Sequence, residues 1–86
     1  MERPWVTSSA YASAIRAIVE IRKAQGLSQR DVAKQIGKPR SFISKIENRE
    51  RRLDIVEFIA LARTLGLDPL RVLEGVIESL PDKLDF

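Results

Sequence analysis

The sequence predicts an all-α domain of five short helices packed around a single core. Apolar residues recur at helical spacing in five separate stretches, and no stretch alternates polar and apolar residues as a strand does. Capping residues and glycines separate these stretches. The chain has 86 residues, enough for one core, and its 44% hydrophobic and 31% charged content is ordinary for a folded domain. It holds neither Cys nor His, so disulfides and thiolate zinc sites are excluded, and we expect no metal and no cofactor.

Residues 1–9 are expected to form an N-terminal arm. They contain Pro4 and a Thr-Ser-Ser run, and the preferred interpretation is a frayed end in which Trp5 covers exposed core. The arm lacks the charged start, apolar run and small-residue cleavage site of a secretory signal. No stretch of the chain is long and apolar enough to span a membrane. We therefore expect a cytoplasmic protein.

The first helix is expected over about 10–24, with Ser9 as its N-cap and Gly26 after its end. Its apolar residues share one stripe, and a charged residue, Arg22, falls in the middle of that stripe. An unpaired charge among apolar neighbours would be costly. We therefore expect Arg22 to have a partner of opposite charge.

Residues 28–48 are typical of a helix, a tight turn and a second helix. Ser28 is a good N-cap, and Asp31 three residues later completes a variant of the capping box. Gly37 suits the left-handed residue that ends a helix, and Pro39 suits the first turn of the next one. The turn is too short for anything but a sharp change of direction, which is the helix-turn-helix geometry.

The second helix of this motif divides into a polar arc and an apolar arc when it is drawn at 3.6 residues per turn. The polar arc consists of Arg40, Ser41, Ser44, Lys45 and Asn48. Every one of these side chains can donate a hydrogen bond, which suits a DNA groove lined with base acceptors. Most polar helix faces are simply solvated, but three arginines follow at once and favour nucleic-acid binding: Arg49, Arg51 and Arg52. Glu47 lies on the core side of the helix, and a buried ion pair with Arg22 would explain both residues.

The charge of the chain is unevenly distributed. Residues 1–53 hold twelve basic and five acidic residues, whereas residues 54–86 hold three basic and seven acidic ones. A polyanion will therefore approach only the half that carries the helix-turn-helix. Arg3 is a further candidate for a DNA contact, if the arm is not frayed.

The last two helices follow the same capping rules. Asp54 begins the fourth helix, and Glu57 completes a second capping box. Asp68 followed by Pro69 begins the fifth helix, which is expected to continue to about residue 80. The chain is thus an arm (1–9), a helix-turn-helix domain (10–80) and a tail (81–86).

The fifth helix and the tail contain more apolar residues than so small a core can bury. These surplus residues either fold back on the domain or form a subunit interface, and we favour an interface. The predicted interface residues are Val76, Leu80, Leu84 and Phe86.

Several fragments in order and spacing resemble the Cro/XRE-type helix-turn-helix family of phage repressors. They are Gly26-Leu-Ser-Gln29, Ala33, Ile36-Gly37, Ile43-Ser-Lys-Ile-Glu-Asn48 and Leu65-Gly-Leu67, and the resemblance runs from about Arg22 to Leu73. It implies the five-helix fold of lambda repressor, with helices two and three as the motif. It also implies that Arg40, Ser41 and Lys45 meet base edges in the major groove. Gln29, Asn48 and the residues just after Asn48 would hold the phosphate backbone, and Arg22 would pair with Glu47.

The sequence departs from the family pattern in three places. Lys38 stands where a small hydrophobic residue usually fills the turn, Arg49 stands where glycine is common, and Leu53 replaces a frequent proline. A left-handed Arg49 would cost about 1 kcal/mol. Phe42 lies beside the polar arc, and we expect it at the edge of the core rather than on thymine methyl groups.

The sequence therefore predicts a transcriptional regulator, a repressor, that binds double-stranded DNA at an inverted-repeat operator as a homodimer and is nucleoid-associated through that binding. The alternative is an antitoxin that binds operator DNA and also a toxin, with its acidic C-terminal half as the protein-binding part. Enzyme activity is not expected, because without His or Cys the serines have no general base and no glycine-rich phosphate loop is present.

Overall fold

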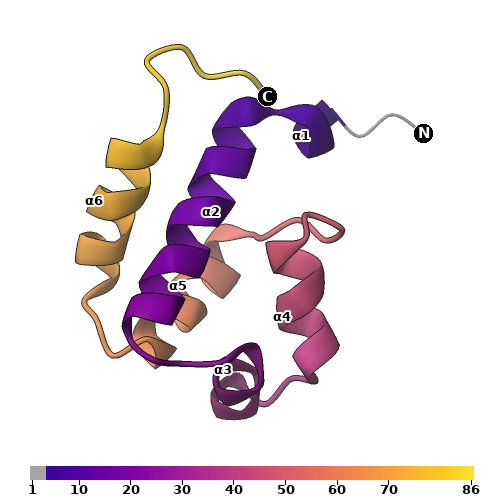
Figure 1. Ribbon diagram of the computed structural model, residues 1–86, viewed down its shortest axis with the longest axis vertical. Coiled ribbons are helices and arrows are strands. Elements are labelled where there is room, and N and C mark those ends of the chain that lie inside the picture. Colours follow the sequence, from indigo (N-terminus) through magenta and orange to yellow (C-terminus); the bar gives the residue numbers. More distant parts are fainter. Residues whose placement is uncertain (1–3) are drawn as a thin grey trace.

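The computed structural model describes residues 4–86, which form six helices and no strand within that range (Figure 1). The helices are α1 (Pro4–Thr7), α2 (Ser9–Ala24), α3 (Gln29–Ile36), α4 (Arg40–Glu47), α5 (Ile55–Thr64) and α6 (Pro69–Ser79). The all-α prediction is confirmed, and α2–α6 are the five expected helices. The short α1 is additional.

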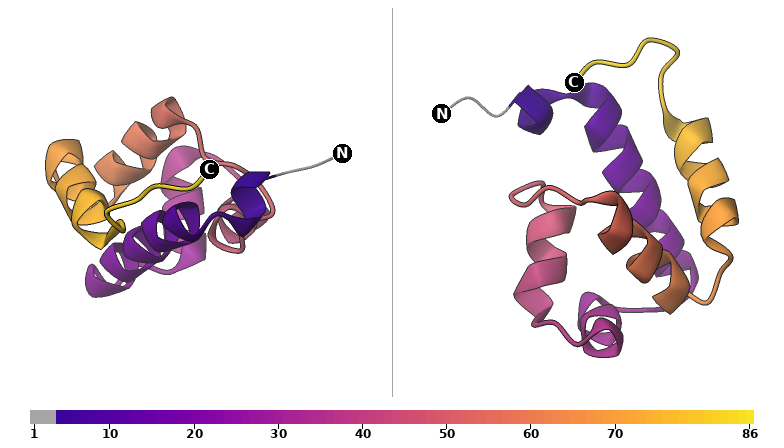
Figure 2. Two further views of the ribbon diagram at one scale, coloured as in Figure 1. Left: turned by 90° about the horizontal axis from the view of Figure 1, so that it is seen from above. Right: turned by 180° about the vertical axis from the view of Figure 1, so that it is seen from behind.

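The long helix α2 runs through the middle of the molecule. Figure 1 shows α6 along one side of α2 and α4 on the other, with α3 crossing below α4. Seen from behind, α5 lies between α4 and α6 (Figure 2). The helix-turn-helix formed by α3 and α4 is therefore on the opposite side of α2 from α6.

The N-caps of α3 and α5 are the residues expected from the sequence. In α3, the Asp31 N–H donates to Ser28 Oγ at 3.0 Å and the Ser28 N–H donates to Asp31 Oδ2 at 2.9 Å. The same reciprocal pair begins α5, with distances of 2.7 and 3.0 Å between Asp54 and Glu57. Gly37 ends α3 with a φ of 71°. Two capping boxes and a left-handed glycine thus fix the ends of the helices that flank α4.

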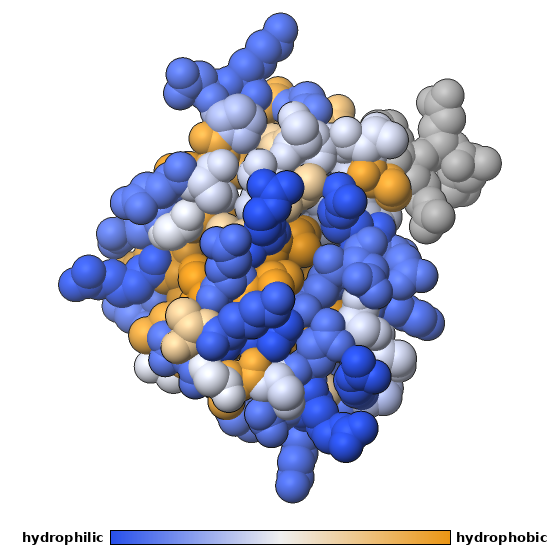
Figure 3. Space-filling model, in the orientation of Figure 1, coloured by the Kyte–Doolittle hydropathy of each residue, from blue (hydrophilic) through white to orange (hydrophobic). Residues whose placement is uncertain are grey.

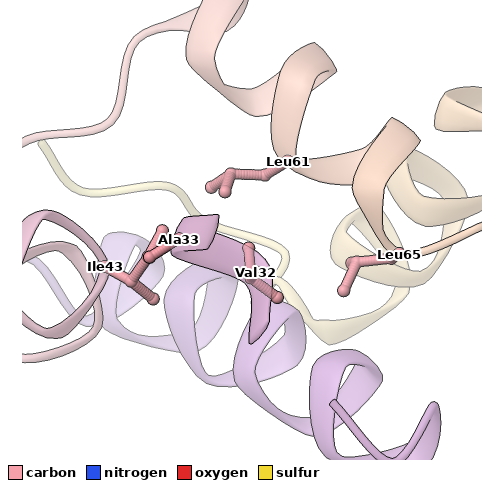
Figure 4. Close-up of a cluster of buried hydrophobic side chains, with 5 residues drawn as sticks. All are labelled: Val32, Ala33, Ile43, Leu61 and Leu65. Carbon is pink, nitrogen blue, oxygen red and sulfur yellow. The ribbon is translucent and has the colours of Figure 1, made fainter. Parts of the chain in front are cut away.

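Most of the buried apolar side chains belong to two groups. Figure 4 shows the first, which joins α3, α4 and α5: Val32, Ala33, Ile43, Leu61 and Leu65. The second joins α2, α4 and α6: Ile15, Ile18, Ile46 and Val76. Ile43 and Ile46 of α4 are both only 2% exposed, one in each group. The orientation of α4 is therefore fixed from two sides.

Val76 corrects the predicted subunit interface. The residue is only 8% exposed and packs in the second group of core side chains. It is buried within one chain, so it is not available to a second one. Helical periodicity predicted the apolar residues of α6 correctly. It could not predict which of them would pack against α2.

The segment expected to be a frayed arm is ordered over residues 4–9. Its single turn, α1, brings the Trp5 ring edge-on to Tyr11, with ring centroids 5.4 Å apart. The N-cap of α2 is Ser8, not Ser9 as predicted, because Ser8 Oγ accepts the Tyr11 N–H at 3.0 Å. Arg3, the candidate DNA contact in the arm, lies outside the described residues.

The tail returns from the end of α6 to the first turn of α2 (Figure 1). The Asp85 carboxylate accepts the Ser9 and Ala10 N–H groups, both at 2.9 Å. Ser8 Oγ donates to the Asp85 carbonyl oxygen at 2.7 Å. Asp85 thus satisfies amide groups that the start of a helix leaves without intrahelical partners. The neighbouring Leu84 and Phe86 remain 50% and 92% exposed.

We expect the Asp85 contacts to stabilise the fold in a pH-dependent way. Hydrogen bonds from the Ala10 and Ser9 N–H groups lower the pKa of Asp85 from 3.8 to about 2. Because the pKa is lower in the folded state, the stabilisation is complete above about pH 4 and is lost as the pH falls towards 2. Asp85→Asn should lower the melting temperature at pH 7 and have a much smaller effect at pH 2. Thermal unfolding across this range measures the difference, with Asp82→Asn in the same tail as the control. A difference between wild type and Asp85→Asn that does not change with pH would contradict the prediction.

Candidate nucleic-acid interface

The side of α4 that faces away from the core carries the polar arc predicted from the sequence. Arg40, Ser41, Lys45 and Asn48 are exposed, and Ser44 is half-buried with its hydroxyl donating to the Ser41 carbonyl oxygen at 3.2 Å. Figure 3 shows that the part of this face formed by α4 is predominantly hydrophilic, while apolar surface gathers over α2 and α6. The structure therefore brings the five predicted groove residues together on one surface.

The expected ion pair between Arg22 and Glu47 is present and nearly buried. The guanidinium donates from Nε to Glu47 Oε2 at 2.7 Å and from Nη2 to Oε1 at 2.9 Å. The two side chains are only 10% and 9% exposed. Arg22 Nη1 also donates to the Leu27 carbonyl oxygen at 2.7 Å, so the pair joins α2, the connection that precedes α3, and α4.

Gln29 belongs to the same network. Its Nε2 donates to Glu47 Oε1 at 2.8 Å. The family resemblance implies a phosphate contact for this residue, and the structure places its amide on the carboxylate of the ion pair. Glu47 therefore accepts hydrogen bonds from two helices and fixes α4 against both.

The connection between α4 and α5, residues 48–54, is named the arginine loop. It begins with Arg49 in the left-handed conformation, at a φ of 61°. The Arg49 N–H donates to the Ile46 carbonyl oxygen and the Glu50 N–H donates to that of Lys45, at 3.0 and 2.8 Å. This is the Schellman arrangement that glycine usually provides. The departure from glycine at Arg49 leaves the backbone geometry unchanged and adds an exposed cation.

The three arginines of the loop are not equivalent. Arg49 and Arg52 are exposed. Arg51 is half-buried, and both of its terminal nitrogens donate to the Glu57 carboxylate, at 2.9 and 2.6 Å. The sequence did not indicate this difference.

Phe42 lies at the edge of the core, as expected. The side chain is half-buried and packs against both groups of core side chains. Lys38 Nζ lies 5.6 Å from the centre of its ring and the Arg51 guanidinium lies 4.6 Å away. Lys38 thus contacts an aromatic face through a cation–π interaction at the position where the family usually has a small apolar residue.

The structure adds Arg30 to the candidate interface. Arg30 and Arg40 line one hollow of about 410 Å³ between the starts of α3 and α4, together with Gln29 and Ser28. The start of a helix attracts anions because its N–H groups and its dipole favour negative charge. Sequence reasoning missed Arg30, although its place beside the N-cap of α3 was a usable signal.

Within residues 4–86, no group of three or more acidic, His or Cys residues is arranged to hold a metal ion. In the same range no helix has the length and apolar character needed to cross a membrane.

The chain is similar to known helix-turn-helix proteins. The family model described as helix-turn-helix matches residues 18–72, which include α3, α4 and α5. The structure of an XRE-family like protein from Pseudomonas syringae pv. tomato str. DC3000 is 38% identical, with a TM-score of 0.76, and the similarity covers 85% of this chain and 89% of that one. The clp gene regulator ClgR from C. glutamicum shares the fold, with a TM-score of 0.71 and 17% identity over 83% of this chain and 92% of that one. No curated protein matches the sequence.

Proposed function

The chain belongs to the Cro/XRE-type helix-turn-helix family of DNA-binding transcriptional regulators. From this premise we propose that it binds an inverted-repeat operator as a homodimer. We also propose that it acts in the cytoplasm and represses transcription. Repression follows if the bound dimer occupies a promoter. The observation that carries the proposal is the exposed polar arc of α4. Two groups of core side chains and the hydrogen bonds of Glu47 hold α4 in place, so the arc is presented in a fixed orientation.

The proposed base contacts come from the arc of α4. An α-helix fits the major groove of B-DNA, and its exposed side chains then reach the base edges. Arg40, Ser41 and Lys45 are assigned to bases, and Ser44 lies beside them. Asn48, Arg49 and Arg52 are assigned to phosphates, and Arg30 is assigned to the phosphate nearest the start of α3.

The proposed dimer interface is the exposed apolar surface of α6 and of the start of α5. Its residues are Ile55, Val56, Leu70, Leu73 and Ile77, which are 74%, 72%, 68%, 41% and 57% exposed. Leu70, Leu73 and Ile77 share one side of α6 at helical spacing. Because α6 and α4 lie on opposite sides of α2, pairing through α6 leaves the arc of α4 open (Figure 1). Of the residues predicted from the sequence, the exposed Leu84 and Phe86 and the half-buried Leu80 stay available to the interface.

The test begins with selection of bound sequences from a random duplex pool, followed by titration of the selected operator at several salt concentrations. We expect an inverted repeat whose binding constant falls steeply as salt rises, because phosphate contacts release counterions. Arg40→Ala should relax the preference at one base pair in each half-site, by about 1–3 kcal/mol if the contact is bidentate to guanine. Arg63→Ala removes an exposed cation of α5 that is assigned neither to DNA nor to the dimer interface, and as the control it should change neither the base preference nor the salt dependence. Absence of duplex binding at low salt would refute the proposal.

A further inference from the structure

The backbone of the arginine loop is held by two helices besides α5. Glu50 and Arg51 both donate their N–H groups to the Lys45 carbonyl oxygen of α4, at 2.8 and 3.1 Å. Leu53 donates its N–H to the Tyr11 hydroxyl of α2 at 3.2 Å. The loop therefore has a defined path from the end of α4 to the start of α5.

The Arg51 side chain completes this arrangement. Its Nη1 donates to Glu57 Oε1 at 2.9 Å and to the Arg52 carbonyl oxygen at 3.0 Å, and its Nη2 donates to Glu57 Oε2 at 2.6 Å. One face of the guanidinium covers the Phe42 ring of α4 at 4.6 Å. A single side chain thus joins α4, the loop and α5.

These contacts engage three of the five N–H donors of the Arg51 guanidinium, whose side chain is 40% exposed. Its bidentate contact with a carboxylate is the strong, planar kind of ion pair. A glutamate carboxylate is ionised at neutral pH, and hydrogen bonding from Arg51 lowers the pKa of Glu57 further. The pair therefore carries no net charge. It neutralises no phosphate, so it releases no counterions from the DNA.

We propose that Arg51 and Glu57 are positioning residues that hold the arginine loop against the DNA backbone, and that Arg51 itself contacts no phosphate. The proposal rests on the DNA binding proposed above. It reverses the sequence-based assignment of Arg51 and adds Glu57, an acidic residue, to the determinants of DNA affinity. Arg49 and Arg52, whose side chains are exposed, carry the phosphate contacts of the loop.

Glu57→Gln gives the sharpest test. Glutamine keeps an oxygen for the Asp54 N–H, so the capping box of α5 survives while the ion pair is lost. Removing a negative charge near DNA would strengthen binding if only net charge mattered. We expect the opposite, a loss of affinity for the selected operator of roughly three- to tenfold, equal to that of Arg51→Ala.

The salt dependence separates positioning from phosphate contact. Glu57→Gln and Arg51→Ala should leave the slope of log K against log salt unchanged, whereas Arg52→Ala should reduce it by about 0.9 for each phosphate that is no longer neutralised. Arg51→Lys keeps the charge but not the bidentate contact, and it should behave as Arg51→Ala does. A reduced slope in Arg51→Ala, or wild-type affinity in Glu57→Gln or Arg51→Lys, would overturn the proposal.

A measurement without DNA tests the positioning role separately. In the free protein, Glu57→Gln and Arg51→Ala should both shift the ring NMR signals of Phe42 and speed the hydrogen exchange of the Leu53 amide, while Arg52→Ala should change neither. Unchanged signals in the first two variants would refute the positioning role even if the protein binds DNA. If the signals change but the wild type binds no duplex, the role in holding the loop stands and the DNA-binding proposal fails.

Discussion

Glu47→Ala is expected to destabilise the folded protein by about 3–5 kcal/mol, the usual effect of leaving one member of a buried ion pair without its partner. Arg22 would keep its charge in a site where its side chain is 10% exposed, with only the Leu27 carbonyl oxygen left to accept from it. The Gln29 amide would lose the same carboxylate. The loss should therefore loosen the attachment of α4 to α2 and α3 together.

A double-mutant cycle measures this interaction. Arg22→Met, Glu47→Leu and the double variant are compared with the wild type by denaturant unfolding. The double variant should lose much less stability than the sum of the single variants, because it leaves no charge buried. Glu50→Ala, which removes an exposed carboxylate near the end of α4, is the control and should have little effect. Additive losses would show that Arg22 and Glu47 do not interact.

Placing two glutamates on the exposed side of α6, by Leu73→Glu with Ile77→Glu, should yield a folded monomer. These side chains are 41% and 57% exposed, so the core of a single chain does not depend on them. A monomer contacts only one half-site of the operator. It therefore lacks the additional affinity that a dimer gains by binding both half-sites at once. We expect operator affinity to fall by about 10²–10⁴-fold, the range by which linked binding exceeds a single contact.

Sedimentation measures the assembly, and titration of the operator measures the affinity. Glu74→Gln with Glu78→Gln changes two exposed polar residues of the same helix and should leave the dimer intact. A wild-type chain that stays monomeric at high concentration and on its operator would refute the interface. A wild-type monomer that binds a different protein through α6 would instead favour the antitoxin alternative.

Local sequence rules predicted much of the motif correctly. Ser28 with Asp31 and Asp54 with Glu57 cap their helices through contacts only three residues apart, so the sequence alone contains both partners. The pairing of Arg22 was also predictable, because a single charge on an apolar stripe needs a partner. For the two caps, spacing along one helix limited the choice of partner.

Two predictions, the N-cap at Ser9 and the interface residue Val76, were wrong because distant parts of the chain meet there. Ser8 caps α2, and its hydroxyl also donates to Asp85, a residue 77 positions away, which no periodicity reveals. The burial of Val76 depends on which side of α6 packs against α2. Arg51 looked like Arg49 and Arg52 in the sequence, and only the path of the arginine loop brings it to the carboxylate of α5.

The return of the tail to α2 has a consequence for chain topology. Asp85 hydrogen-bonds Ser9 and Ala10, 76 and 75 positions away, so noncovalent contacts close the chain into a ring. A circular permutant that joins residue 86 to residue 4 through a flexible linker, and opens at Gly66 between α5 and α6, would retain the helix-turn-helix, the ion pair and the arginine loop without interruption. The linker would replace a hydrogen-bonded closure by a covalent one, at a chain-entropy cost that grows only slowly with its length. The order of the helices along the chain could thus be changed without changing the surface that α4 exposes.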